Sequence, residues 1–115
     1  MGRKTRRKLD RNELREEALR PCPTLGYDRD TLASHLIRRE AFSLAESQLR
    51  RAIWLNPYEP RFKEHLAWAL FMQGRHAEAR AWVQQALEGQ PDSANAREIL
   101  TLLDEAQSPR NATPG

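Results

Sequence analysis

The residue types that most often carry chemistry are few in this chain of 115 residues. The histidines, His35, His65 and His76, include no pair three or four residues apart, as a metal site on one helix requires. Cys22 is the single cysteine and lies between two prolines, so it forms no internal disulfide and has no histidine placed by sequence to activate it. The glycines are isolated and build no phosphate-binding loop. We therefore expect no enzymatic activity, no metal and no cofactor.

Basic residues are concentrated at the N-terminus. Residues 1–20 carry eight basic and four acidic residues, a net charge of +4, whereas residues 21–115 carry 11 and 12, a net charge of −1. Such a segment is a solvated tail or a contact for nucleic acid, an acidic protein surface or anionic lipid. No aromatic residue is interleaved to stack on bases, so nucleic-acid binding here would be weak and independent of base sequence. The basic residues without acidic neighbours are Arg3, Lys4, Arg6, Arg7 and Lys8.

The composition favours helices. Alanine and leucine are the commonest apolar residue types, and each alone outnumbers valine, isoleucine and threonine taken together. No apolar run approaches the roughly 20 residues of a membrane-spanning helix, so we expect no integral membrane segment. The residues after Thr5-Arg6-Arg7 are charged where an export signal would be apolar, so we expect a cytoplasmic protein.

The chain divides into a central region and two flanks. Residues 5–20 have a narrow apolar stripe that predicts a weakly amphipathic helix, which makes residues 1–20 a basic helical tail. Pro21 and Pro23 end this helix and open a linker over residues 21–27. Residues 107–115 lack an apolar anchor, which predicts a disordered tail.

The central region repeats with a period of about 34 residues, within the range that is typical of helical repeat proteins. Pro57 and Pro91 lie one period apart, and apolar residues match at the same offset on the N-terminal side of both. One such match carries little information, but seven matches and a proline at one offset indicate a true repeat. The matching pairs are Leu32 and Leu66, Ala33 and Ala67, Leu36 and Leu70, Ala45 and Ala79, Leu49 and Val83, Ala52 and Ala86, and Ile53 and Leu87.

Each period contains two segments with helical spacing of apolar residues, separated by a short break. Gly74 in the second break favours the left-handed conformation that closes a helix. The repeated spacing places alanines such as Ala33 and Ala45 where two helices cross closely, because a small side chain lets the backbones approach. Asp92 is suited to cap the helix that follows the second period.

This pattern resembles the tetratricopeptide repeat, a helix–turn–helix unit of about 34 residues. The resemblance implies an all-α, right-handed helix–turn–helix solenoid over residues 28–106, with repeats at 26–59 and 60–93 and a capping helix at 94–106. The sequence departs from the usual pattern at Arg29 and Lys63, where tryptophan is common, and at Glu40, where glycine is common.

In this family the first helix of each pair lines a concave groove that holds partner peptides. The resemblance therefore implies a protein-binding adaptor or scaffold, with Trp68, Phe71 and Met72 as an apolar patch that the core does not need and with Arg38, Arg61 and Glu64 as orienting charges. The expected groove residues are Tyr27, Asp30, Ser34, Ile37, Arg38, Arg61, Glu64, Trp68, Phe71, Met72, Asn95, Glu98 and Leu102.

Two questions remain open from the sequence. The apolar patch is a partner-binding surface, or it is covered by a second copy or by the N-terminal helix. The binding surface is formed by the repeats, or it is the basic tail, which would make the chain a nucleic-acid- or ribosome-associated protein. A chaperone-type carboxylate clamp does not fit, since the corresponding positions are Asp30, Ser34, His65, Asn95 and Ile99, and only Asn95 matches.

Overall fold

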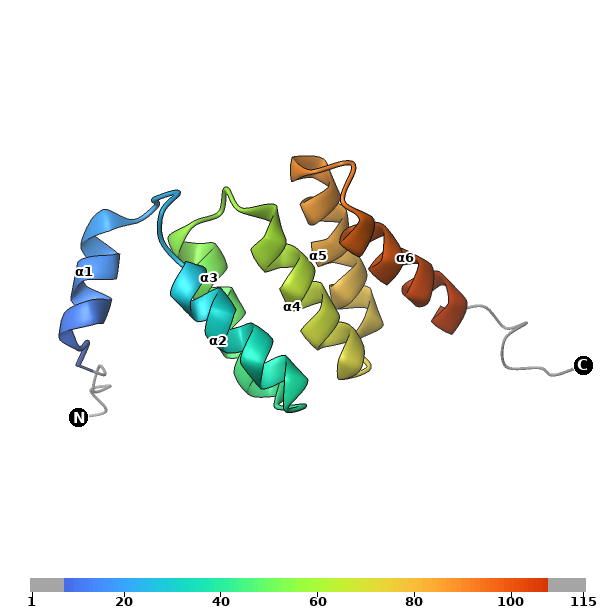
Figure 1. The fold of residues 1–115 in the computed structure, drawn as a ribbon, viewed down its shortest axis with the longest axis horizontal. Coiled ribbons are helices and arrows are strands. Elements are labelled where there is room, and N and C mark those ends of the chain that lie inside the picture. The colour runs from blue at the N-terminus through green and yellow to red at the C-terminus, as the bar shows by residue number, and fades with distance from the viewer. Residues whose placement is uncertain (1–7, 108–115) are drawn as a thin grey trace, which may run out of the picture.

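The computed structural model describes residues 8–107, which form six helices and contain no strand (Figure 1). The all-α prediction is thereby confirmed. Among the described residues, no helix combines the length and apolar character needed to cross a membrane. The helices are α1 (Arg11–Leu19), α2 (Tyr27–Arg38), α3 (Phe42–Leu55), α4 (Pro60–Met72), α5 (His76–Gly89) and α6 (Ala94–Gln107).

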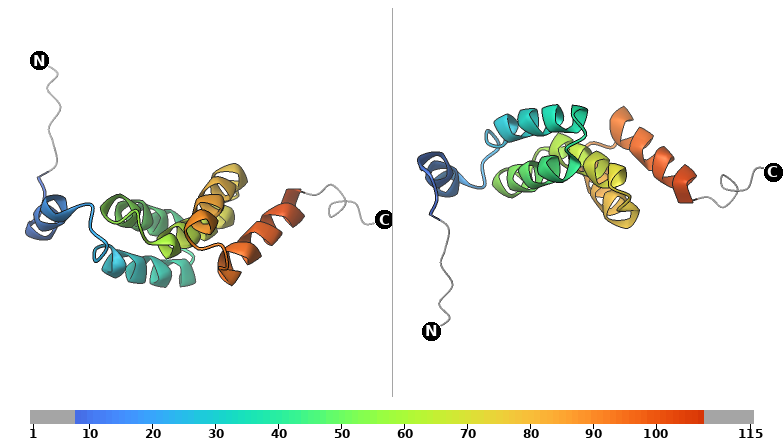
Figure 2. Two further views of the ribbon diagram at one scale, coloured as in Figure 1. Left: turned by 90° about the horizontal axis from the view of Figure 1, so that it is seen from above. Right: turned by 90° about the horizontal axis from the view of Figure 1, so that it is seen from below.

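The helices α2 to α6 pack in two layers. Helices α2, α4 and α6 form one layer, and α3 and α5 form the other (Figures 1 and 2). Helix pairs α2–α3 and α4–α5 are the two units of the repeat, with α3 packed against α4 and α5 against α6. Helix α1 lies at one end of the array and α6 at the other. We call the surface of the first layer the α2–α4–α6 face.

The core lies between these two layers and combines large and small side chains. Leu66 and Leu70 of α4 are fully buried, and each contributes about 2 kcal/mol by leaving water. Ala33 and Ala67, one repeat apart, are also fully buried, as close helix crossings require. Leu32 departs from the predicted pattern, because its side chain is 45% exposed whereas Leu66 is buried. Helix α2 is the first helix of the array and has no preceding helix pair to cover that side.

The two helix pairs share the same turn. Glu40 and Gly74 occupy equivalent positions and both have a positive φ, of 62° and 80°. In both turns this residue donates its amide hydrogen to the carbonyl three residues earlier, at Ile37 and Phe71. The left-handed conformation predicted for Gly74 is therefore present, and Glu40 adopts it without the freedom of glycine.

The conformation of Glu40 gives a stability prediction. A side chain in the left-handed region costs about 1–2 kcal/mol, and glycine removes this strain at a smaller cost in chain entropy. We expect Glu40→Gly to raise the free energy of unfolding by about 0.5–1 kcal/mol, measured by urea denaturation with circular dichroism. Glu40→Ala is the matched control and should give no comparable gain. An equal gain from both variants would assign the effect to the glutamate charge instead of the backbone.

Helix α1 differs from the predicted N-terminal helix. It begins at Arg11, because the Asp10 carboxylate accepts a hydrogen bond from the Glu13 amide, 2.8 Å away, and the Glu13 side chain accepts one from the Asp10 amide. The predicted start at residue 5 lies outside the described residues. Residues 11–19 contain two arginines and three glutamates, so the helix itself has a net charge of −1. Of the predicted basic tail, residues 1–7 lie outside the described residues, and Lys8 is exposed.

Helix α1 is attached to the array by charged contacts. Glu16 is only 4% exposed and accepts two hydrogen bonds from Arg29 of α2, the shorter 2.8 Å long, and one from Arg51 of α3. The hydrogen bond from Arg29 is the main reason that the pKa of the Glu16 carboxyl lies below its ordinary value. The Arg20 guanidinium adds a cation–π contact, 3.7 Å from the centre of the Trp54 ring.

The segment between α1 and α2 is bound to the end of α3. The Cys22 amide donates to the Leu55 carbonyl, and the Asn56 side-chain amide donates to the carbonyls of Pro23 and Leu25. Asn56 is 1% exposed, so these bonds are made away from water. Residues predicted as a linker thus follow a defined path into the first helix pair.

Candidate functional site

Two adjoining clefts lie where α4 meets α6. The α4–α6 cleft has a volume of about 220 Å³, and the turn cleft, at the N-terminal ends of the same helices, about 330 Å³. Glu64 and Asn95 line both. The α4–α6 cleft is lined by Glu64, His65, Trp68, Asn95, Glu98 and Ile99. The turn cleft is lined by Glu59, Arg61, Glu64, Gln90, Asp92, Ser93, Ala94 and Asn95.

Asp30 connects α2 to α4 beside these clefts. Its carboxylate is buried, with one oxygen 2.6 Å from His65 Nδ1 and the other 3.6 Å from Arg61 Nε. This contact holds the His65 ring at the wall of the α4–α6 cleft. Arg61 is still 52% exposed, so its guanidinium also faces solvent. The predicted groove residues Asp30 and Arg61 are thus brought together in one charged cluster.

Tyr27 also spans from α2 to the start of α4. Its hydroxyl donates a 2.7 Å hydrogen bond to Glu59, and its ring contacts Phe62 edge to face at 5.1 Å. The hydrogen bond to Glu59 is the main reason that the pKa of the Tyr27 hydroxyl is raised. The Arg61 guanidinium lies 5.5 Å from the centre of the same ring. Tyr27 therefore helps to fix the position of α2 relative to α4, and part of its side chain remains exposed on the α2–α4–α6 face.

Glu64 was predicted as an orienting charge on the groove surface, but its side chain is buried. It is 4% exposed and accepts a 2.7 Å hydrogen bond from the hydroxyl of Ser93. Ser93 in turn accepts a hydrogen bond from the Ala96 amide and so caps α6. The cap predicted at Asp92 is wrong by one residue, because α6 begins at Ala94 and its preceding residue is Ser93.

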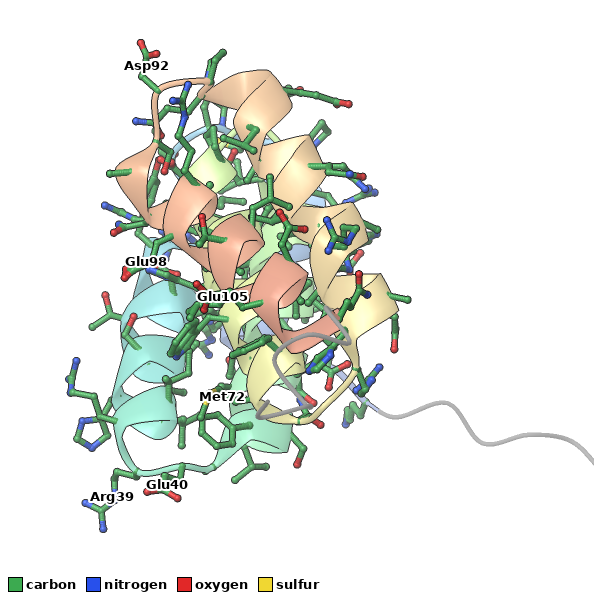
Figure 3. The ribbon with its side chains drawn as sticks, turned by 90° about the vertical axis from the view of Figure 1, so that its right-hand side faces the viewer. Arg39, Glu40, Met72, Asp92, Glu98 and Glu105 are labelled. Atoms are coloured by element: carbon green, nitrogen blue, oxygen red, sulfur yellow. The ribbon has the colours of Figure 1, made fainter. Side chains whose placement is uncertain are left out.

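The patch predicted from Trp68, Phe71 and Met72 is only partly exposed. Trp68 and Phe71 are partly buried and pack against the core, with their ring centres 5.7 Å apart. The Phe71 ring also stacks on His76 at 5.2 Å. The expectation that the core does not need these side chains is therefore wrong, because Trp68 and Phe71 both pack against the core and Phe71 also contacts α5 through His76. Met72 is 44% exposed, at the end of α4 (Figure 3).

The remaining predicted groove residues lie away from the two clefts. Ile37 is partly buried against the core, and Arg38 is exposed in the last turn of α2. Leu102 is half-buried on α6. The structure thus gathers Glu64 and Trp68 at the α4–α6 cleft and Tyr27 and Arg61 beside it, but it does not bring Ile37, Arg38 or Leu102 into the same site.

The pairing of Asp30 with His65 is a feature that the sequence analysis missed. The two residues are 35 apart, one repeat length plus one residue, which is a spacing at which successive first helices can touch. The available signal was an acidic residue type and a basic residue type at that spacing. Within residues 8–107, histidine, cysteine, aspartate and glutamate side chains form no group of three that could hold a metal ion.

Comparison with known proteins identifies the repeat. A family model described as "Tetratricopeptide repeat" matches residues 31–94, which is 64 of the 115 residues and more than half of the chain. The match begins within α2 and ends at the first residue of α6. No curated protein matches the chain.

Proposed function

The chain belongs to the tetratricopeptide repeat family, and on this premise we propose that it is an adaptor that binds a partner protein or peptide on its α2–α4–α6 face. The family assignment confirms what the period of the sequence predicted. Repeats of this family generally mediate protein–protein interactions and are typically non-enzymatic scaffolds. We accordingly propose a non-enzymatic role.

The observation that carries this proposal is the pair of adjoining clefts between α4 and α6. They combine a partly buried aromatic side chain, Trp68, with exposed polar ones such as Asn95 and Glu98. An apolar anchor surrounded by polar groups is the usual composition of a protein-binding site. Asp30 argues against a partner held by its C-terminal carboxylate, since a second carboxylate beside it would be repelled.

The basic tail receives no support as the binding site. The helix that follows it has a net charge of −1 and is attached to the array by Glu16. The exposed arginines of α1, Arg11 and Arg15, are outnumbered by its three glutamates, so the helix does not extend the positive charge of the tail. We therefore propose one working surface, the α2–α4–α6 face.

The proposal predicts which face crosslinks to a partner. A photoreactive amino acid placed at Asn95 lies on the α2–α4–α6 face, and one placed at Glu88 of α5 lies on the other layer; both positions are exposed. In native lysate treated with nuclease, we expect the Asn95 position to capture a protein several-fold more efficiently than the Glu88 position. The crosslinked protein is identified by mass spectrometry.

Two results would contradict the proposal. Capture from Glu88 alone would move the binding surface to the second layer. Loss of all captured protein after nuclease treatment would point to nucleic acid as the bound species. The same photoreactive variants, irradiated as purified protein, report self-association, because a dimer crosslinked from Asn95 would show that a second copy occupies the face.

A further inference from the structure

Glu64 is unusual among the buried carboxylates of this chain. Within residues 8–107 three carboxylates are buried, at Glu16, Asp30 and Glu64. Glu16 is paired with two arginines, and Asp30 with His65 and Arg61. Glu64 has no basic side chain within ion-pair distance in the described part of the chain, although removing a charge from water without a partner is costly.

Only one of the two carboxylate oxygens of Glu64 accepts a hydrogen bond from the described residues. Its Oε2 accepts the hydrogen bond from Ser93, and no hydrogen bond to its Oε1 occurs among residues 8–107. Only Arg51 Nε is both enclosed and without a partner among the described side-chain atoms. Glu64 Oε1 is therefore not fully enclosed by the protein, and Glu64 is a lining residue of both clefts.

A second carboxylate stands at the same cleft. Glu98 is exposed and projects from α6 on the side of α2, away from α5 (Figure 3). No basic side chain lies within ion-pair distance of it in residues 8–107. His65 and Arg61 are the nearest basic residues in the two clefts, and both contact Asp30. Glu64 and Glu98 thus line the α4–α6 cleft, and the one basic residue in its lining, His65, is already bound to Asp30.

Trp68 supplies an aromatic surface beside these charges. Its side chain is partly buried and lines the α4–α6 cleft. A positive group lying over an indole ring is stabilised by the ring's electron density, and a nearby carboxylate adds to this attraction. The chain already makes this kind of contact elsewhere, where the guanidinium groups of Arg20 and Arg51 lie 3.7 and 4.7 Å from the Trp54 ring centre.

We propose that the α4–α6 cleft binds one cationic side chain, an arginine or a lysine, of the partner. Trp68 contacts its apolar stem or its charged group, Glu64 and Glu98 supply the opposing charge, and the partner's cation takes the place that Arg29 takes at Glu16. The volume of about 220 Å³ is below the range of about 300–1,000 Å³ typical of small-molecule sites, which suits a single side chain. This inference rests on the proposed protein-binding function and specifies the chemistry of the partner.

The test uses short peptides as probes. The peptides acetyl-Gly-Ser-X-Ser-Gly-amide, with arginine, lysine or glutamine at X, are titrated into the full-length protein and followed by NMR. The chain has three tryptophans, so the indole N–H of Trp68 is assigned from the Trp68→Phe variant. We expect a saturable shift of this signal with arginine or lysine at X and none with glutamine. Trp54, already in contact with two guanidinium groups, should not respond.

Matched variants separate the cleft from general electrostatics. We expect Glu64→Gln and Glu98→Gln together to weaken binding of the arginine peptide by about tenfold or more. Glu88→Gln on α5 removes the same charge elsewhere and should leave the affinity within about twofold. Because Glu64→Gln retains the size of the side chain and relieves an unpaired buried charge, the thermal midpoint of the double variant should not fall, which excludes unfolding as the cause.

Three results would overturn the inference. They are an equal response to the glutamine peptide, an unchanged affinity in the double variant, and an equal loss in Glu88→Gln. If the peptides fail while the residue placed at Asn95 still captures a partner, the adaptor function stands and only the cationic specificity is wrong. If that capture also fails, the proposed function fails with it.

Discussion

Replacing Gly26 with alanine is expected to lower the free energy of unfolding by about 2–4 kcal/mol, the sum of backbone strain and overpacking. Gly26 precedes α2 with φ at +92°, a conformation that costs an L residue about 1–2 kcal/mol. A Cβ at this position would also lie 2.8 Å from Cε2 of Phe62 and 3.1 Å from the Ala52 carbonyl oxygen. The fully buried Phe62 ring has little room to move, so overpacking adds to the strain. Chemical denaturation measures the sum.

Gly74→Ala is the matched control for this variant. Gly74 also has a positive φ, of +80°, but a Cβ there would meet no atom within 4 Å. We expect it to cost about 1 kcal/mol, so the difference between the two variants isolates the contact with Phe62. Equal losses would show that the linker moves aside and that Gly26 matters only for its backbone conformation.

The repeating part of the fold could be predicted because apolar residues of similar size recur at the same positions in each period. Helices that bury the same face in every period keep apolar residues at a constant offset, which is why Ala33 and Ala67 predicted two equivalent helix crossings. The offset carries no information about the ends of the array. The exposure of Leu32 and the start of α1 at Arg11 depend on contacts made once, and periodicity cannot report them.

The candidate site was predicted less completely for a similar reason. Helical spacing tells which residues share a face of α4, but not which other helices reach that face. Trp68 and Phe71 were therefore placed outside the core, although they contact it. The same limit applies to Glu64, whose residue type predicts exposure. Its burial depends on Ser93, which lies in the turn between α5 and α6 and donates a hydrogen bond to it. The two residues are 29 apart, so no local sequence pattern predicts this contact.

The contacts of the buried charges connect the fold to its proposed function. Glu16 and Asp30 are paired with basic residues from neighbouring helices, and so they join elements of the fold. Glu64 lacks such a pairing and lines the clefts. A charge kept buried without a cation lowers stability, and proteins commonly retain such groups where binding needs them. This contrast is the reason to expect that Glu64 serves a partner more than it serves the fold.

Phe62→Ala is expected to have the largest effect of any substitution argued for this chain, a loss of about 3–5 kcal/mol. Phe62 is the largest fully buried side chain, and it contacts the Tyr27 ring and the Gly26 backbone. Its loss leaves a cavity where the linker, α2 and α4 meet. A domain of this size is stable by about 5–15 kcal/mol, so the variant should unfold at much lower urea concentration.

The position of Phe62 also determines how the result is tested. Tyr58→Ala removes an aromatic ring four residues earlier that is 61% exposed, and we expect it to cost under about 0.5 kcal/mol. Phe62→Leu keeps most of the volume and should cost about 1–1.5 kcal/mol. In the Phe62→Leu background, Gly26→Ala should lose less stability than in the native sequence, because the ring atoms that its methyl group meets are gone. Additive losses in this double variant, measured by urea denaturation, would show that Gly26 and Phe62 act independently, contrary to the contact seen in the structure.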